Sequence, residues 1–189
     1  MAINKTSQLR IIAGRWRGRK IKFVDQDDLR PTPDRVRETL FNWLQSDVPD
    51  AVCLDLYAGS GALGFEAASR GARQVTLVDS SKQACQVIEK NITNLQSTDM
   101  RVVVSDALDY LESSETKFDV VFLDPPYKSD ILSRVFMILE QEQCLSEHAK
   151  IYVEHDAKQS LPELPINWHV LKNKTAGQVS YCLIDRIKT

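Results

Sequence analysis

The chain has 189 residues, of which 43 % are hydrophobic and 26 % charged, with seven glycines, seven prolines and a formal net charge of −2. This length suits one domain with a sizeable core rather than two, and the hydrophobic fraction excludes a wholly disordered chain. No apolar run approaches the ~18 residues of a membrane-spanning helix, and residues 1–10 lack the apolar core of a signal peptide.

The cysteines point to a reducing compartment. All four lie far apart inside apolar segments, and their spacing matches neither a zinc site nor a disulfide framework. They are Cys53, Cys85, Cys144 and Cys182. We therefore expect a cytoplasmic protein with reduced thiols, no bound metal, no membrane contact and no obligate protein partner.

The amino-terminal segment carries an excess of positive charge. Residues 1–24 contain seven basic side chains and no acidic one, whereas the rest of the chain contains 17 basic and 26 acidic side chains. Two short β-prone runs, 9–13 and 20–24, flank Arg15-Trp16-Arg17, which lies between two glycines, and this pattern predicts a β-hairpin.

Such a hairpin combines cations that can meet phosphates with an aromatic ring that can stack on a base, as is typical of a nucleic-acid contact. The alternative is a solubilising segment with Trp16 packed on the domain. The side chains expected to make the contact are Arg10, Arg15, Trp16, Arg17, Arg19, Lys20, Arg30 and Arg35.

A helix is predicted next. Thr32 is suited to cap it and Pro33 to its first position. Val36, Leu40, Trp43 and Leu44 then recur on one helical face, which predicts a core stripe. Arg30, Arg35 and Arg37 lie at the helix start and on its other faces, where we expect them to extend the basic surface.

The remaining chain alternates between strands and helices. We predict strands over 51–57, 74–79, 101–105, 118–123 and 150–154, with helices over 62–70, 82–94, 107–112 and 130–141. Segments 167–171 and 179–187 have no long helical pattern between them, which predicts an antiparallel pair at one sheet edge. The pattern indicates a doubly wound, Rossmann-like α/β domain over residues 30–189, preceded by a basic hairpin extension over residues 1–29.

The loop after the first of these strands has the glycine spacing of a dinucleotide site. Gly59, Gly61 and Gly64 match the fingerprint, and Asp79 lies twenty positions beyond Gly59, where an acid can bind ribose hydroxyls. Asp55, just before the turn, argues against NAD, because a carboxylate is a poor neighbour for a pyrophosphate. It suits a cation instead, such as the ammonium and sulfonium groups of S-adenosylmethionine. Turn or helix caps are the alternative roles for both acids.

Asp106 follows the third strand of the alternating region and is suited to bind an adenine amino group, although aspartate is also a common helix N-cap. The residues expected to bind the cofactor are Asp55, Ala58, Gly59, Ser60, Gly61, Asp79, Ser80, Asp106 and Ala107.

The most specific motif is Asp124-Pro125-Pro126-Tyr127, at the end of the fourth strand. In a doubly wound sheet this strand lies beside the first one, at the switch point where ligands bind. The prolines fix the backbone and lack an N–H, so the carboxylate of Asp124 and the carbonyl of Pro125 can both accept hydrogens from an exocyclic base amine. Tyr127 can stack on that base. These three are the candidate catalytic residues.

Together these motifs resemble a known family. Residues 55–61 and 124–127 resemble the S-adenosylmethionine-dependent amino-methyltransferases, whose (Asp/Asn/Ser)-Pro-Pro-(Tyr/Phe/Trp) motif marks methylation of base nitrogens. With the segments 10–14, 30–32 and 35–41, the chain looks like the D-type family of bacterial 16S rRNA guanine-N2 methyltransferases over essentially its whole length.

The resemblance implies a class I methyltransferase sheet, an N-terminal hairpin that engages RNA, and methyl transfer to a guanine N2 in 16S rRNA on an assembled or nearly assembled small subunit. S-adenosylhomocysteine is the implied second product. Transfer would be a direct displacement that depends mainly on positioning, with Asp124 or water taking the proton. His148, His155 and His169 lie outside the motifs, and we interpret them as structural or surface residues.

Three alternatives stay open at this point. An NAD-dependent oxidoreductase shares the glycines and Asp79 but leaves Asp55 and the two prolines without a role. An adenine or cytosine amino-methyltransferase acting on DNA or RNA shares the chemistry, although the DNA enzymes usually carry a larger target-recognition region. A non-catalytic RNA-binding assembly factor needs the hairpin but not Asp124 or Tyr127.

Overall fold

The computed structural model describes residues 6–24, 31–126, 131–141 and 144–187. Its strands are β1 (Thr6–Arg10), β2 (Lys20–Val24), β3 (Val52–Asp55), β4 (Gln74–Asp79), β5 (Met100–Val104), β6 (Phe118–Leu123), β7 (Leu145–Asp156), β8 (Trp168–Ala176) and β9 (Val179–Arg186). Its helices are α1 (Asp34–Trp43), α2 (Ala62–Ser69), α3 (Lys82–Leu95), α4 (Ala107–Ser113) and α5 (Ile131–Gln141). No helix in these ranges is long and apolar enough to cross a membrane.

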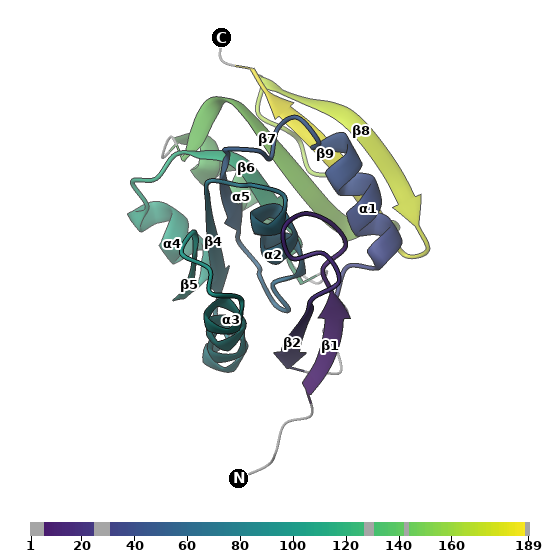
Figure 1. Ribbon diagram of the computed structural model, residues 1–189. Helices are drawn as coiled ribbons and strands as arrows, with labels where there is room; N and C mark the ends of the chain where they lie inside the picture. Colours follow the sequence, from purple (N-terminus) through teal and green to yellow (C-terminus); the bar gives the residue numbers. More distant parts are fainter. Residues whose placement is uncertain (1–5, 25–30, 127–130, 142–143, 188–189) are drawn as a thin grey trace.

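The described part of the chain forms a main sheet of seven strands in the order β5-β4-β3-β6-β7-β9-β8 (Figure 1). Strands β3 to β7 are mutually parallel, and β9 is antiparallel to both of its neighbours. The chain order reverses at β3 and β6, where Asp55 pairs with Phe122. The predicted doubly wound architecture is therefore confirmed, with its switch point between β3 and β6 and an antiparallel pair at one edge.

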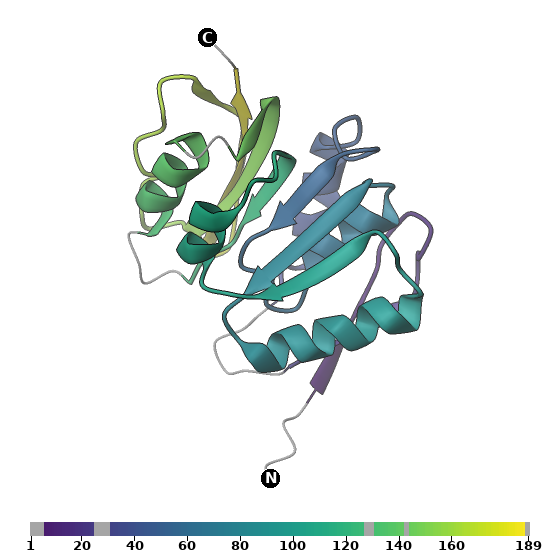
Figure 2. The ribbon, with the colours of Figure 1, turned by 90° about the vertical axis from the view of Figure 1, so that its left-hand side faces the viewer.

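Helices cover both faces of this sheet. Strand residues alternate between two apolar clusters, so that Cys53 packs on the side of α1, α2 and α3, whereas Val52 and Leu54 pack on the side of α4 and α5. Figure 2 shows α4 and α5 on one side of the sheet and α1, α2 and the β1–β2 hairpin on the other. This burial on two faces explains why the parallel strands are almost continuously apolar.

Helix α2 is buried on every side, and a carboxylate lies in its middle. The Glu66 carboxylate, with no exposed area, accepts backbone N–H groups from Ile12 at 2.9 Å and Ala13 at 3.0 Å. It also pairs with Arg70 at 2.8 Å and with the buried Arg37 at 3.5 Å. One side chain thus connects the loop of the hairpin to α1 and α2.

The hairpin loop lies directly against the end of α2. Gly14 has a φ of +79°, and a Cβ there would lie 1.8 Å from the carbonyl oxygen of Ser69, so only glycine fits. The Ser69 backbone oxygen accepts the N–H of Arg15 at 2.8 Å, and its hydroxyl accepts that of Trp16 at 3.0 Å. The hairpin is therefore anchored on the domain rather than suspended from it.

Two details of the amino-terminal segments differ from the predictions. Strand β1 ends earlier than residue 13, because the N–H groups of Ile12 and Ala13 bond to Glu66 instead of to a strand, and it begins earlier than residue 9, because Thr6 already pairs with Val24 of β2. Thr32 does not cap α1, whose N-cap is Pro33. The Thr32 hydroxyl donates a hydrogen bond to Glu154 instead. The proposed boundary between residues 29 and 30 falls outside the described residues, so the division into two parts stays a prediction.

We predict that Glu66→Gln destabilises the protein by about 3 kcal/mol, because it removes a buried carboxylate that pairs with Arg70 and Arg37 and leaves the buried Arg37 guanidinium only the exposed Asp34 as counter-charge. Urea unfolding of both proteins at neutral pH measures the difference. The matched control is Glu89→Gln on the exposed side of α3, where a change of less than about 0.5 kcal/mol is expected. Equal effects of the two substitutions would contradict the role assigned to Glu66.

Candidate functional site

The glycine loop forms a tight turn between β3 and α2. Gly59 and Gly61 have φ angles of +49° and +75°, which favour glycine. Gly64 is required by packing instead, since a Cβ there would lie 2.8 Å from the Leu77 side chain on β4. The loop therefore brings its backbone close to the carboxyl ends of the strands. Ala58 is buried in it and donates its N–H to Val78 at 2.9 Å.

Asp79 connects the end of β4 to this loop. Its two oxygens accept the N–H groups of Gly59 at 2.7 Å and Ser81 at 2.8 Å. These are the bonds of a cap, one of the two roles considered for this acid; a ribose contact stays a prediction. Ser80 beside it is exposed, and the buried Ser60 accepts the N–H of Ala62 at 3.3 Å.

Asp106 is the N-cap of α4. Its carboxylate accepts the N–H of Leu108 at 2.8 Å, and Ala107 after it is buried. The neighbouring Tyr57, from the glycine loop, is half-buried, and its hydroxyl has no hydrogen-bond partner among the described residues. Burial, together with the Asp106 carboxylate, raises the pKa of Tyr57. An adenine contact of Asp106 stays a prediction.

Asp55 is buried at the end of β3. Its Oδ2 accepts the N–H of Gly64 at 2.9 Å, so it braces the start of α2. Burial raises the pKa of Asp55 to about 7; the Gly64 N–H opposes the shift, and the Asp79 and Glu154 carboxylates add to it.

Asp124 follows β6 and is half-buried, while Pro125 after it is buried. The Asp124 carboxyl has no hydrogen bond or ion pair within the described ranges. Burial, followed by repulsion from Glu154 and Asp55, raises its pKa well above the ordinary range. Tyr127, the third candidate catalytic residue, lies outside the described residues.

Glu154, near the end of β7, was not among the predicted site residues. It is 2 % exposed, and its Oε1 accepts the hydroxyls of Tyr152 at 2.8 Å and Thr32 at 3.0 Å. Burial raises its pKa, and the two hydroxyl bonds oppose that shift. The sequence does hold a signal for it, because Glu154, like Asp55 and Asp124, is an acid at the carboxyl end of a predicted strand.

Asp55, Asp124 and Glu154 form what we call the carboxyl row. Each of these acids comes two positions after an apolar residue. Those apolar residues are Cys53, Phe122 and Tyr152, and all three pack in the cluster on the side of α1, α2 and α3. Since side chains two apart in a strand share a face, the three acids project to one side of three adjacent strands. No described basic side chain pairs with them. Such a site favours cationic or N–H-rich ligands.

The hairpin presents most of its predicted basic residues to solvent. The exposed side chains are those of Arg10, Arg15, Arg17, Arg19 and Lys20, joined by Arg35 of α1. Arg15 is also ion-paired with Asp99 and lies 4.0 Å over the ring of Trp16. Arg30 lies outside the described residues.

Two predictions about this surface require correction. Trp16 is buried in the core beneath Arg15, which leaves little of its ring for a base, so the alternative of a packed tryptophan describes it better. Arg37 does not extend the basic surface, because it is 1 % exposed and pairs with Glu66 and Asp34. Neither result follows from local sequence, because both depend on contacts with distant residues.

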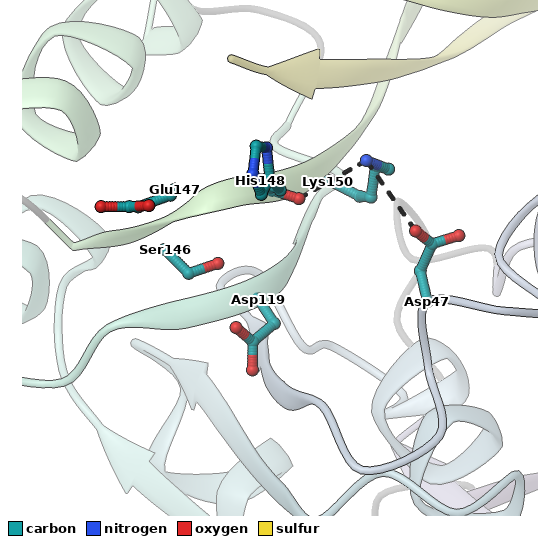
Figure 3. A pocket seen from close by; sticks show the side chains of 6 residues that line it. All are labelled: Asp47, Asp119, Ser146, Glu147, His148 and Lys150. Carbon is teal, nitrogen blue, oxygen red and sulfur yellow. Dashed lines mark hydrogen bonds and ion pairs between the residues drawn. The ribbon is translucent and has the colours of Figure 1, made fainter. Parts of the chain in front are cut away.

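A surface hollow of about 300 Å³ lies elsewhere, at the amino ends of β6 and β7 (Figure 3). Its lining residues are Asp47, Asp119, Ser146, Glu147, His148 and Lys150. Several of these groups are already engaged, since Lys150 pairs with Asp185 at 2.6 Å and Asp119 accepts the Val52 N–H at 2.8 Å. Parallel sheets bind ligands at the opposite ends of their strands. The carboxyl row and the glycine loop are therefore the candidate functional site.

We predict that Asp55→Asn stabilises the protein more at pH 8 than at pH 5. Folding raises the pKa of Asp55, so the folded protein binds this proton more tightly than the unfolded chain does. The loss of stability caused by the buried acid therefore grows as the pH rises towards 7 and reaches its full value above pH 7. Asparagine accepts the Gly64 N–H without titrating, so the stabilisation by this substitution should be about 2.5 kcal/mol larger at pH 8 than at pH 5. Urea unfolding at both pH values measures it, with exposed Asp109→Asn as control. A gain independent of pH would contradict the prediction.

Comparison with known proteins places the whole chain in one group. The model of the family described as "Conserved hypothetical protein 95" matches residues 9–185. "Ribosomal RNA small subunit methyltransferase D" of Escherichia coli K12 is 46 % identical over 96 % of this chain and 91 % of its own. The Haemophilus influenzae protein of that name is 44 % identical over 95 % of each chain. The solved E. coli structure yhhF superposes with a TM-score of 0.90 at 45 % identity, covering 97 % of this chain and all of its own.

Proposed function

The chain belongs to the Conserved hypothetical protein 95 family together with these small-subunit rRNA methyltransferases, and from this premise we propose that it transfers a methyl group to 16S rRNA. The methyl donor is S-adenosylmethionine, and the acceptor is the exocyclic N2 of a guanine. The proposed substrate is an assembled or nearly assembled small subunit in the cytoplasm.

The observation that carries this proposal is the place of Asp124. Its carboxyl has no partner in the described structure, follows the strand paired with β3, and lies in one row with Asp55 beside the glycine loop. An acid in this position can accept a hydrogen from an amine, and we propose the backbone carbonyl of the buried Pro125 as the second acceptor. Two acceptors hold an otherwise poorly nucleophilic aromatic amine in the geometry for attack.

The residues around the glycine loop fit the proposed donor. The donor supplies a methyl group on a positively charged sulfur. Asp55 offers a carboxylate without a basic partner among the residues described, which suits a cation, and the backbone of Gly59 to Gly61 approaches the ligand end of β3 without a side chain at either glycine. We assign the ribose hydroxyls of the donor to Asp79 and its adenine amino group to Asp106. The same carboxylates would repel a pyrophosphate, which argues against NAD.

The acceptor base is proposed to lie over β6 and β7. Asp124 and the Pro125 carbonyl bind its amine, and Tyr127 stacks on the ring. Alkylation makes the amine acidic, so its proton passes to Asp124 or to water without a strong base. The exposed arginines of the hairpin bind phosphates of the surrounding RNA, at a fixed distance from the carboxyl row because the hairpin is anchored on α2.

The direct test is transfer of labelled methyl from S-adenosylmethionine into free 16S RNA and into small subunits from cells that lack the enzyme, followed by nucleoside analysis. N2-methylguanosine is the expected product, with subunits as the better acceptor. N6-methyladenosine would instead identify an adenine methyltransferase, and absence of transfer to either acceptor would favour a non-catalytic assembly factor.

Asp124→Ala should lower the single-turnover rate of methyl transfer by roughly 100-fold or more, because one acceptor of the amine is removed. Donor affinity, measured by calorimetry, should change less than about threefold, since Asp124 faces the acceptor. Asp109→Ala, an exposed acid on α4, serves as control for both measurements. Equal losses of rate and of donor affinity would remove Asp124 from the catalytic role.

The double substitution of Arg17 and Arg19 to Ala should weaken binding of the RNA acceptor and leave donor affinity unchanged. Neither side chain has an ion pair in the described structure, so both are available for phosphates. For each arginine that binds a phosphate, its removal should reduce the slope of log affinity against log salt by about 0.7–0.9. Lys158→Ala, an exposed lysine outside the hairpin, is the control. An unchanged salt slope would contradict the assigned role of the hairpin.

A further inference from the structure

Glu154 has no role in the proposal so far, although it is one of the most buried acids in the protein. In the parallel pairing of β6 and β7, Leu123 lies opposite Val153, so Asp124 and Glu154 occupy the next positions of the two strands. Neighbouring strands are about 4.8 Å apart. A group bound at Asp124 therefore has Glu154 as its neighbour on the side of β7.

The order of the strands separates the two substrates. Residues proposed for the donor lie at the ends of β5, β4 and β3, and Asp124 at the end of β6 receives the amine. Glu154 lies one strand further from the donor, on the same face as Asp124 and Asp55. It is therefore placed to meet the part of the acceptor base next to its amine.

Two hydrogen bonds favour the ionised, accepting form of Glu154 against the effect of burial. The hydroxyls of Thr32 and Tyr152 both donate to Oε1, and hydrogen bonds from donors favour the ionised carboxyl. No hydrogen bond of Oε2 occurs among the residues that the structure describes. Thr32 comes from the segment before α1 and Tyr152 from β7, so two parts of the chain fix this carboxylate.

An acceptor beside the amine distinguishes guanine from the other bases that carry an amine. In guanine, the carbon that bears the exocyclic N2 lies between N1, which carries a hydrogen, and N3, which only accepts, so the amine has an N–H donor on one side. In adenine and cytosine, the ring nitrogen next to the amine has no hydrogen and only accepts, so a carboxylate there would be opposed to another acceptor.

We propose that Glu154 selects guanine as the target base by accepting a hydrogen bond from N1–H while Asp124 and Pro125 hold the adjacent amine. This inference rests on the proposed transfer to guanine N2 and assigns the residue that recognises the base. Glu154 is thus a specificity-determining residue that contacts substrate, and the hydroxyls of Thr32 and Tyr152 are the groups that position it.

The test compares guanine with 2-aminopurine at the target position of the RNA acceptor, introduced on a synthetic segment and assembled into subunits where these are required. 2-Aminopurine keeps the amine, but its N1 has no hydrogen. Wild-type protein should methylate guanine at least about tenfold faster, the value of one hydrogen bond to a charged group. Glu154→Gln should reduce this preference to about threefold or less, because its amide can also donate to N1 of 2-aminopurine.

A structural role would give a different result. If Glu154 only supports the fold, Glu154→Gln lowers the rates on both bases by the same factor, and an unchanged preference overturns the proposal. The donor dissociation constant and the unfolding midpoint are measured alongside, with exposed Glu163→Gln as the charge-matched control. Should Glu154→Gln not fold, Thr32→Val and Tyr152→Phe each remove one donor to Oε1. Unchanged preference in both of these variants also overturns the proposal.

The outcomes separate this inference from the function on which it rests. If the wild-type protein forms no N2-methylguanosine, the proposed function itself is wrong. If it forms N2-methylguanosine and Glu154→Gln keeps the wild-type preference for guanine, only the role of Glu154 is wrong.

Discussion

The architecture depends on a carboxylate that has been removed completely from water. Glu66 accepts two backbone N–H groups of the hairpin loop and pairs with arginines of α1 and of its own helix. A buried ion of this kind is tolerated only when its partners are all in place, so it specifies one arrangement of the elements around it. Helix α2, about 12 Å long at 1.5 Å per residue, then holds the glycine loop at one end and the hairpin at the other. The proposed RNA contact and the proposed donor site are therefore parts of one rigid body.

Positive and negative side chains gather at different places on this body, although the formal net charge of the chain is only −2. The hairpin presents cations to solvent, which attract a polyanion over a long range. The carboxyl row instead has three acids, two of them buried and Asp124 half-buried, without a basic partner among the described residues. Burial raises the pKa values of all three, and repulsion from neighbouring acids adds to the shift at Asp55 and Asp124. This arrangement costs stability in the free protein, and a ligand with cationic or N–H groups offsets that cost when it binds. In the proposed function, the hairpin at one end of α2 attracts the RNA over a long range, and the carboxyl row at the other end selects the bound groups.

The order of the elements was predictable from the sequence, because apolar periodicity and the glycine spacing are local signals. The acids at strand ends were predictable for the same reason, and Glu154 satisfied that rule without being selected. Arg37, Trp16 and Thr32 could not be placed in this way. Their partners Glu66, Ser69 and Glu154 lie 29, 53 and 122 residues away, and a basic or aromatic residue looks the same in sequence whether its partner is RNA or a distant part of the chain.

The three strands of the carboxyl row explain how recognition and chemistry can be combined in a small domain. In the proposed reaction, β3 meets the cation of the donor, β6 holds the amine, and β7 reads the ring beside that amine. Adjacent parallel strands place these functions side by side at the spacing of a sheet, without a separate domain for base recognition. Selection of the RNA then depends on the hairpin, whereas selection of the base depends on β7. Thr32 joins Glu154 to the segment before α1, and Arg37 of α1 joins Glu66, so each kind of selection is tied to α1 or the segment just before it by a buried polar contact.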